Sequence, residues 1–210
     1  INAGHGTKGG ESVKTLCHPD GSAKVTGGST AQGAIRATSI NGGTTLNDGT
    51  PEAKATLNLA MIVKQKLLKA GYNVLMVREG EDAQIDNIGR TVYANNCADY
   101  HIALHYDSTS SNKGAFYIGV PDNQSYKNMY PVSKNWKKHS KLGKNLVLGM
   151  KNAGVKIHGN GVMGIDLTQT SYSTIPSVDL EVGDKSSNHS NKTLETIAIG
   201  IVKGMNKVNK

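Results

Sequence analysis

The sequence predicts a single α/β domain with a mixed, mostly parallel central sheet flanked by helices. Segments with an apolar stripe at helical spacing alternate with short apolar segments of strand length, a pattern typical of α/β folds. A chain of 210 residues can bury a sizeable core without cross-links. No internal repeat and no linker divides it, so we expect one domain over residues 1–210.

Charge and composition restrict the partners. The formal net charge of +8 favours polyanions, such as nucleic acid, an anionic membrane or an acidic wall polymer. With one Trp, one Phe and no interleaved basic and aromatic residues, we do not expect nucleic acid. No apolar run approaches the roughly 20 residues of a membrane span. The start at Ile1 without Met is typical of a trimmed chain, so the missing leader says little.

The chain begins as a strand that turns at once into Gly4-His5-Gly6. The following residues, 7–50, are rich in Gly, Thr and Ser and lack periodicity, which predicts a long insertion over approximately 11–48. Loops of this length tend to be functional or to contain short strands. We hypothesise that the insertion forms a wall beside the site and selects substrates; the alternative is a surface elaboration without a role.

The first helix is predicted from Thr50 as N-cap and Pro51 as first helical residue, and Gly71 ends it. Its apolar positions recur at helical spacing and comprise Leu59, Ala60, Val63, Leu67 and Ala70. A strand over Tyr72 to Val77 should follow.

Further helices are expected over Ile85 to Asn96, from about Lys138 to Ala153, and at the C-terminal end. The last helix has one apolar stripe, formed by Leu194, Ile197, Ala198, Ile201, Met205 and Val208. Strands are expected over Tyr100 to Tyr106, Ala115 to Val120 and Ser177 to Val182, and residues 121–137 should be irregular.

Two histidines are candidate metal ligands. His5 lies between glycines, whose missing side chains allow a close approach of the backbone, although the local sequence by itself favours a plain turn histidine. His105 ends an apolar strand, where a site at the edge of a sheet would lie. His101 shares its face but lies roughly 13 Å away, so we expect a structural role for it, either hydrogen-bonded or partly exposed.

Two carboxylates complete the candidate site. Glu52 lies in the first turn of its helix, where a carboxylate also favours the helix dipole in any protein. Glu181 lies within a short apolar strand, and burying an unpaired acid is costly. Asp179 shares its face, so one of the two could simply form a salt bridge.

Two His and one carboxylate form a familiar catalytic zinc set with one position left for water. Zinc lowers the pKa of that water to about 7, and an unligated Glu can carry its proton to a leaving amine. No compact motif such as H-E-x-x-H is present, so each signal is weak by itself.

Together the segments resemble the zinc-dependent N-acetylmuramoyl-L-alanine amidases, a family of autolysins, sporulation amidases and endolysins. The resemblance spans the chain apart from the insertion. The segments that carry it are Ile1 to Gly6, Glu52 with Leu57 to Ala60 and Gly71 to Val74, Val74 to Arg78, Arg90 to Asn95, Ala98 to His105, and Pro176 to Gly183.

The resemblance implies a zinc amidase catalytic domain with Zn2+ held by His5, Glu52 and His105. It implies cleavage of the amide between N-acetylmuramic acid and L-alanine by zinc-activated water, with Glu181 as general base and then acid. The partners would be peptidoglycan and anionic wall polymers. The location would be secreted or in the cell wall, and we expect a monomer.

The sequence departs from the family pattern at three places. The Glu ligand usually follows the first His sooner, so Glu11 is a rival of Glu52, although it lacks the following helix. Asp107 stands where Asn is frequent, and Gly183-Asp184-Lys185 replaces an aromatic residue, which would alter the groove.

Two other functions stay open: a zinc peptidase that cuts the peptide stem, and a basic wall-binding module without catalysis. Cys17 and Cys97 could form a disulfide, but two buried thiols are favoured slightly because the chain needs no cross-link.

Overall fold

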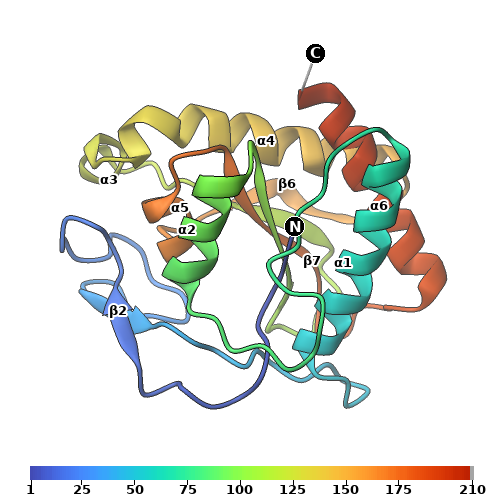
Figure 1. Ribbon diagram of the computed structural model, residues 1–210, viewed down its shortest axis with the longest axis horizontal. Coiled ribbons are helices and arrows are strands. Elements are labelled where there is room, and N and C mark those ends of the chain that lie inside the picture. The colour runs from blue at the N-terminus through green and yellow to red at the C-terminus, as the bar shows by residue number, and fades with distance from the viewer. Residues whose placement is uncertain (209–210) are drawn as a thin grey trace.

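The structure, a computed structural model, describes residues 1–208. Five strands form the central sheet in the order β1-β4-β7-β5-β6 (Figure 1). Their bounds are Asn2–Ala3 (β1), His101–Asp107 (β4), Ala115–Gly119 (β5), Ile157–Gly164 (β6) and Ser177–Asp184 (β7). The pairs β1–β4, β4–β7 and β5–β6 are parallel, and β5–β7 is antiparallel. The predicted mixed, mostly parallel sheet in a single α/β domain is therefore confirmed.

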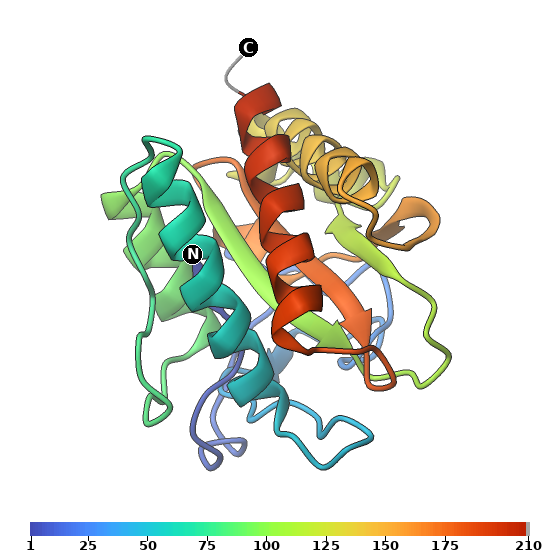
Figure 2. The same cartoon turned by 90° about the vertical axis from the view of Figure 1, so that its right-hand side faces the viewer.

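Six helices surround the described sheet. Their bounds are Glu52–Lys69 (α1), Asn87–Cys97 (α2), Gln124–Asn128 (α3), Val132–Asn152 (α4), Thr168–Tyr172 (α5) and Asn191–Val208 (α6). Figure 2 shows α1, α6 and α4 in front of the sheet, where they bury the main apolar cluster. The shorter α2 and α5 lie on the opposite side and contact β4 and β7.

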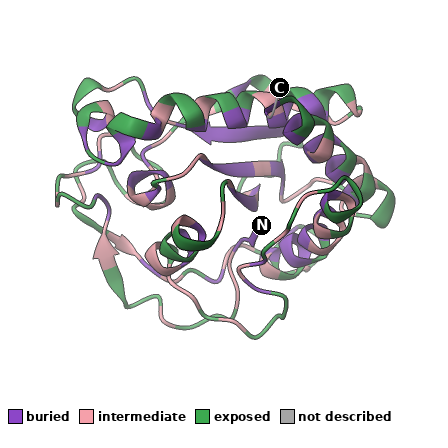
Figure 3. Ribbon diagram, turned by 45° about the horizontal axis from the view of Figure 1, so that its top comes forward, coloured by how far each residue is buried: buried purple, intermediate pink, exposed green. Residues whose placement is uncertain are grey.

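Alternation along β4 and β7 separates the core from the candidate site. Ile102 and Leu104 belong to the apolar core, whereas His101 and His105 point to the opposite face, because successive strand residues alternate. On β7, Leu180 likewise packs in the core between Asp179 and Glu181. Figure 3 shows the buried strands beneath helices whose outer surfaces are exposed. The sheet thus presents one apolar face and one face with ionisable groups.

Two predictions are wrong: the N-cap of α1 and the strand expected directly after this helix. Pro51, not Thr50, is the N-cap, and no side chain caps the helix; instead the Glu52 N–H donates to the Thr44 carbonyl at 2.9 Å. The segment from Tyr72 to Val77 forms no strand. It lies beside the start of the chain, where Ile1 accepts a hydrogen bond from the Val77 N–H and donates one to Leu75, too few bonds for a ladder.

The region 121–137 is more helical than predicted. It contains α3, and α4 begins at Val132 rather than near Lys138, because Val132, Asn135 and His139 form a buried stripe that the polar composition obscured. Strand β6 and helix α5 were not predicted; β6 is rich in glycine and partly exposed, so it lacks the pattern of a buried strand.

The predicted insertion contains a two-stranded antiparallel ribbon of β2 (Lys14–Leu16) and β3 (Arg36–Thr38), and the rest is irregular. Cys17 and Cys97 are both free thiols, as the sequence slightly favoured, but Cys97 is exposed, so the expectation of two buried thiols is wrong for Cys97. Within residues 1–208 no helix has the length and apolarity needed to cross a bilayer.

Candidate metal centre

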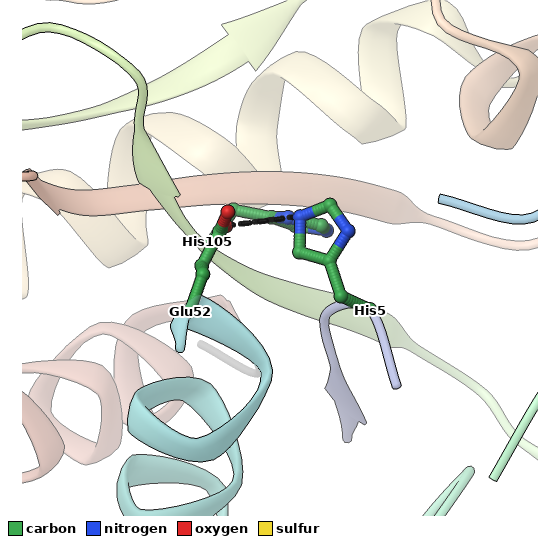
Figure 4. A group of neighbouring side chains, drawn as sticks. All are labelled: His5, Glu52 and His105. Atoms are coloured by element: carbon green, nitrogen blue, oxygen red, sulfur yellow. Dashed lines mark hydrogen bonds and ion pairs between the residues drawn. The ribbon is translucent and has the colours of Figure 1, made fainter. Parts of the chain in front are cut away.

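Three side chains from distant parts of the sequence meet at one edge of the sheet (Figure 4). His5 follows β1, Glu52 begins α1 and His105 lies near the end of β4. His5 Nε2 lies 3.0 Å from Glu52 Oε1 and 3.0 Å from His105 Nδ1. His105 Nδ1 lies 3.3 Å from Glu52 Oε1. Three potential ligand atoms therefore surround one point.

The glycines beside His5 allow the close approach expected of them. His5 has a positive φ of 59°, a conformation that a non-glycine residue adopts rarely. A Cβ at Gly4 would lie 2.5 Å from His105 Cε1, and one at Gly6 would lie 2.0 Å from the Ala83 carbonyl oxygen. Side chains at either position would push His5 away from His105.

The insertion orients two of the candidate ligands. His5 Nδ1 lies 2.8 Å from the Asn41 carbonyl, so Nδ1 carries the proton and the lone pair of Nε2 faces the cluster. Glu52 accepts hydrogen bonds from the Thr44 N–H at 2.9 Å and from the Tyr106 N–H at 3.0 Å. Partners of this kind fix the ring and the carboxylate before any ion binds.

Two buried arginines hold the backbone of the turn that carries His5. Arg78 donates to the carbonyls of Ala3 and Gly4, at 3.1 and 2.8 Å. Arg90 donates to the His5 carbonyl at 2.7 Å and to Asn2 Oδ1 at 2.8 Å. Because several charge-assisted bonds converge on so short a segment, the unusual conformation of His5 is well supported.

The electrostatics around His105 favour a positive charge. Burial alone would lower the pKa of His105, but Asp179 and Glu52 raise it to about 10. For Glu52 burial acts in the opposite direction and would raise the pKa, yet the imidazoles of His105 and His5 bring the pKa well below its ordinary range. His105 Nε2 faces Asp179, whose Oδ2 lies 3.9 Å away.

Glu181 is the neighbour of His105 across the parallel pair of β4 and β7. Adjacent strands lie about 4.8 Å apart, so the two side chains start close together on the same face. Burial and the nearby Asp179 raise the pKa of Glu181 well above its ordinary value. Glu181 Oε2 is buried without a hydrogen-bond partner among the described residues. A buried polar atom without a partner at a site is typical of a group kept for a ligand or reactant.

The three donor groups fit a zinc ion. Nitrogen and carboxylate ligands lie about 2.0–2.2 Å from zinc, so two ligands of a tetrahedral ion are roughly 3.3 Å apart. The observed separations of 3.0, 3.0 and 3.3 Å are close to this value. Two imidazoles and a carboxylate also match the ligand types that zinc prefers at catalytic sites.

A cleft of 660 Å³ opens onto the cluster. The insertion lines this cleft with residues between Lys24 and Thr44, and Ile165, Leu167 and Gln169 line it as well. Glu181 lines the same cleft as His5, Glu52 and His105. The insertion is therefore part of the site and does not lie elsewhere on the surface.

A buried carboxylate fastens the insertion to the body. Asp166 is fully buried and pairs with Lys24 at 2.7 Å and with His18 at 3.0 Å. It also accepts the Val25 N–H at 2.6 Å and the Thr26 hydroxyl. We call this group the Asp166 clamp, because four residues of the insertion bond to one residue that follows β6.

The other candidates lie outside the cluster. Glu11 is exposed and accepts the Gly9 N–H, so it is not a rival of Glu52. His101 is buried, and its Nδ1 lies 3.2 Å from Ser177 Oγ, in agreement with a structural role. Asp107 lines the cleft and pairs with Lys113 at 3.0 Å. Asp184 lies outside the cleft lining and holds the loop after β4 by accepting the Ser111 N–H.

Several residues that support the candidate site could not be identified from the sequence. Asn41 and Thr44 act through backbone groups, which leave no signal in residue type. Arg78 and Arg90 lie within segments that carry the family resemblance, but their role as backbone anchors needed the structure.

The fold and the cluster together define an α/β protein with a candidate site for one metal ion at the edge of its sheet. The family model described as N-acetylmuramoyl-L-alanine amidase matches residues 1–207, and the chain belongs to this family. Membership classes the protein as an enzyme that acts on peptidoglycan. No curated protein matches the sequence.

Solved structures with the same fold are distant in sequence. The N-acetylmuramyl-L-alanine amidase Ami1 from Mycobacterium smegmatis has a TM-score of 0.78 and 17% identity, covering 99% of this chain and 94% of that one. Ami1 from Mycobacterium abscessus has a TM-score of 0.77 and 18% identity, covering 100% and 96%. The CwlD amidase from Clostridioides difficile, in complex with the GerS lipoprotein, has a TM-score of 0.68 and 18% identity, covering 99% and 95%.

Proposed function

We propose that the protein is a zinc-dependent N-acetylmuramoyl-L-alanine amidase, with His5, Glu52 and His105 as metal ligands and Glu181 as general base and acid. The main support is the convergence of three zinc-type ligand atoms, 3.0–3.3 Å apart, in a cleft that also contains Glu181, whose carboxyl oxygen Oε2 is buried without a hydrogen-bond partner among the described residues. Zinc bound there would act as a Lewis acid and lower the pKa of a coordinated water.

The residues of the chain then divide the remaining tasks. Glu181, next to His105 in register, takes the proton of the attacking water and returns it to the nitrogen of the leaving L-alanine. Its raised pKa suits this exchange, because a carboxylate whose pKa is raised by burial and by Asp179 is a stronger base and accepts a proton more readily. Asp179 faces His105 Nε2 and orients the ring.

The insertion selects substrates in this proposal. It lines the cleft beside the candidate ligands, and the Asp166 clamp fixes its position. A rigid side of the cleft excludes peptidoglycan fragments of the wrong shape, because the cleft cannot widen without breaking buried ion pairs. The substrate would place the protein in the wall or outside the cell.

The test compares purified protein with Glu181→Ala and Glu181→Gln on purified walls. We expect all three to bind one zinc per chain, and we expect both variants to lose 10²–10⁴-fold in activity. Unreduced activity in both variants would remove Glu181 from the mechanism, and a chain without bound zinc would contradict the metal assignment.

The new chain ends identify the bond that is cut. A free lactyl carboxyl group on muramic acid supports the amidase. New ends within the peptide stem would instead favour a zinc peptidase. Binding to walls without any cleavage in zinc-replete buffer would favour a non-catalytic module.

A further inference from the structure

Helix α4 concentrates positive charge on the outside of the molecule. It contains no Asp or Glu over Val132–Asn152, although the chain has 16 acidic residues. Its six lysines are all exposed, and they are Lys134, Lys137, Lys138, Lys141, Lys144 and Lys151. We call these six residues the lysine stripe.

The lysine stripe follows one side of the helix. Lys134, Lys138 and Lys141 recur three or four residues apart, as do Lys137, Lys141 and Lys144, so these lysines share one broad face. The opposite side is buried and includes Val132, His139, Leu142, Leu146 and Met150. From Lys134 to Lys151 the stripe spans about 25 Å at 1.5 Å per residue. Figure 1 shows α4 along the outer edge of the molecule, at the top of the view.

Neighbouring residues extend the charge and do not neutralise it. Helix α6 packs against α4 and adds the exposed Lys203 and Lys207. The acidic residue of α6, Glu195, is paired with Lys66 of α1. Like charges at helical spacing repel one another and destabilise a helix. Repulsion without neutralising acids indicates a surface suited to an external polyanion.

The surroundings of the stripe favour one class of polyanion. A membrane-binding helix needs an apolar face to insert, but the apolar face of α4 is buried, and Leu148 is the exposed large apolar residue within the helix. Single-stranded nucleic acid needs aromatic stacking platforms, yet the one aromatic residue of α4, Trp136, is partly buried under Lys127 and Lys137.

We propose that the lysine stripe binds a flexible, phosphate-bearing polymer of the cell wall. Lysines about 5–6 Å apart along a helix can each meet one charge of a polymer with a short anionic repeat. Binding of this kind keeps the protein on the wall and leaves the metal cluster untouched. The inference therefore does not rest on the catalytic roles of His5, Glu52, His105 and Glu181.

The test uses a triple substitution and a control of equal charge. K134Q/K138Q/K144Q removes three stripe lysines for which the structure shows no hydrogen bond or ion pair within residues 1–208. K54Q/K69Q/K192Q removes three exposed lysines from α1 and α6. Both variants lower the net charge by three, so only position differs. The ligands are inorganic polyphosphate, and walls before and after acid extraction of their phosphate polymers.

We expect the stripe variant to bind polyphosphate and unextracted walls at least 10-fold more weakly, whereas the control changes less than 3-fold. The slope of log affinity against log salt should fall by about 2 for the stripe variant, since each phosphate contact contributes roughly 0.7. Cleavage of a soluble muropeptide should be equal in both variants and the parent. If the parent protein does not cleave the muropeptide, that result contradicts the proposed function and leaves the binding inference unaffected.

Three outcomes would overturn the inference. One is an equal loss in both triple variants, which would mean a general effect of net charge. Another is unchanged binding of the stripe variant to polyphosphate. The last is tighter binding of the parent protein to phosphatidylglycerol vesicles or to oligo(dT) than to polyphosphate, which would assign the stripe to a membrane or to nucleic acid.

Discussion

At the residue scale, Gly43 lies where a side chain would collide with the candidate ligands His5 and Glu52. Its φ is +79°, and an added Cβ would lie 2.7 Å from the His5 ring. Gly21 has a similar φ of +75° but open space around it. These two glycines therefore separate the cost of backbone strain from the cost of crowding the site.

We expect Gly43→Ala and Gly21→Ala each to lower the free energy of unfolding by about 1–2 kcal/mol, because both force alanine into the left-handed region. Only Gly43→Ala should weaken zinc binding, by roughly 10–100-fold, since it displaces His5. Competition with a chromophoric chelator measures the zinc affinity. Equal zinc affinity in both variants would show that His5 tolerates displacement or is no ligand.

At the element scale, the Asp166 clamp joins the insertion to the loop after β6. Replacing Asp166 by Asn leaves Lys24 buried without a counter-charge, so we expect the free energy of unfolding to fall by about 3–5 kcal/mol. The exposed pair of Lys64 and Glu79, at 2.7 Å, is the control; Glu79→Gln should cost less than about 1 kcal/mol. Urea denaturation of zinc-loaded protein measures the free energy of unfolding of both variants. An equal loss of stability in the two variants would contradict a stabilising role of the Asp166 clamp.

A second element-scale contact joins α4 to the start of β7. His139 is buried, and its Nδ1 accepts the Ser177 N–H at 2.9 Å, so the ring is neutral in the folded protein. Burial, together with Lys138, lowers the pKa of His139 to about 4. The unfolded chain binds a proton on this ring near pH 6.5, but the folded chain binds it only near pH 4.

Unfolding therefore takes up a proton between these values, and stability falls as pH drops from about 6.5 to 4. The contribution of His139 is on the order of 3 kcal/mol. His139→Gln should flatten this part of the stability profile, which denaturation at pH 7, 5.5 and 4 would measure. A profile as steep as that of the parent would remove His139 as its cause.

At the scale of the whole molecule, the ion would link three distant parts of the chain. His5, Glu52 and His105 belong to β1, α1 and β4 regions that separate on unfolding, so zinc would bind the folded state alone. At a free zinc concentration 1,000 times the Kd, the added stability is about 4 kcal/mol. For a chain of this length we expect the Tm to rise by roughly 8–16 °C.

Calorimetry with zinc and with a chelator measures this difference. His105→Ala is the control, and its Tm should be the same in both buffers. A parent protein whose Tm does not respond to the chelator would contradict a structural link through the ion.

The sequence by itself determined the fold class and most elements, because periodic burial leaves a pattern in residue type. The apolar stripes of α1 and α6 and the apolar strands β4 and β7 were readable in this way. The polar start of α4 and the exposed β6 were not, because their burial depends on neighbours far away in the chain.

The local sequence left the role of each candidate site residue ambiguous, and only resemblance to a family identified the set of His5, Glu52, His105 and Glu181 as site residues. Only the tertiary structure decided that the first three meet within one cluster, and that Glu181 lines the same cleft. It also decided that backbone groups of Asn41 and Thr44 in the insertion orient the candidate ligands. Such contacts depend on chain positions in space, and any residue type carries the same N–H and carbonyl groups, so no local sequence pattern encodes them.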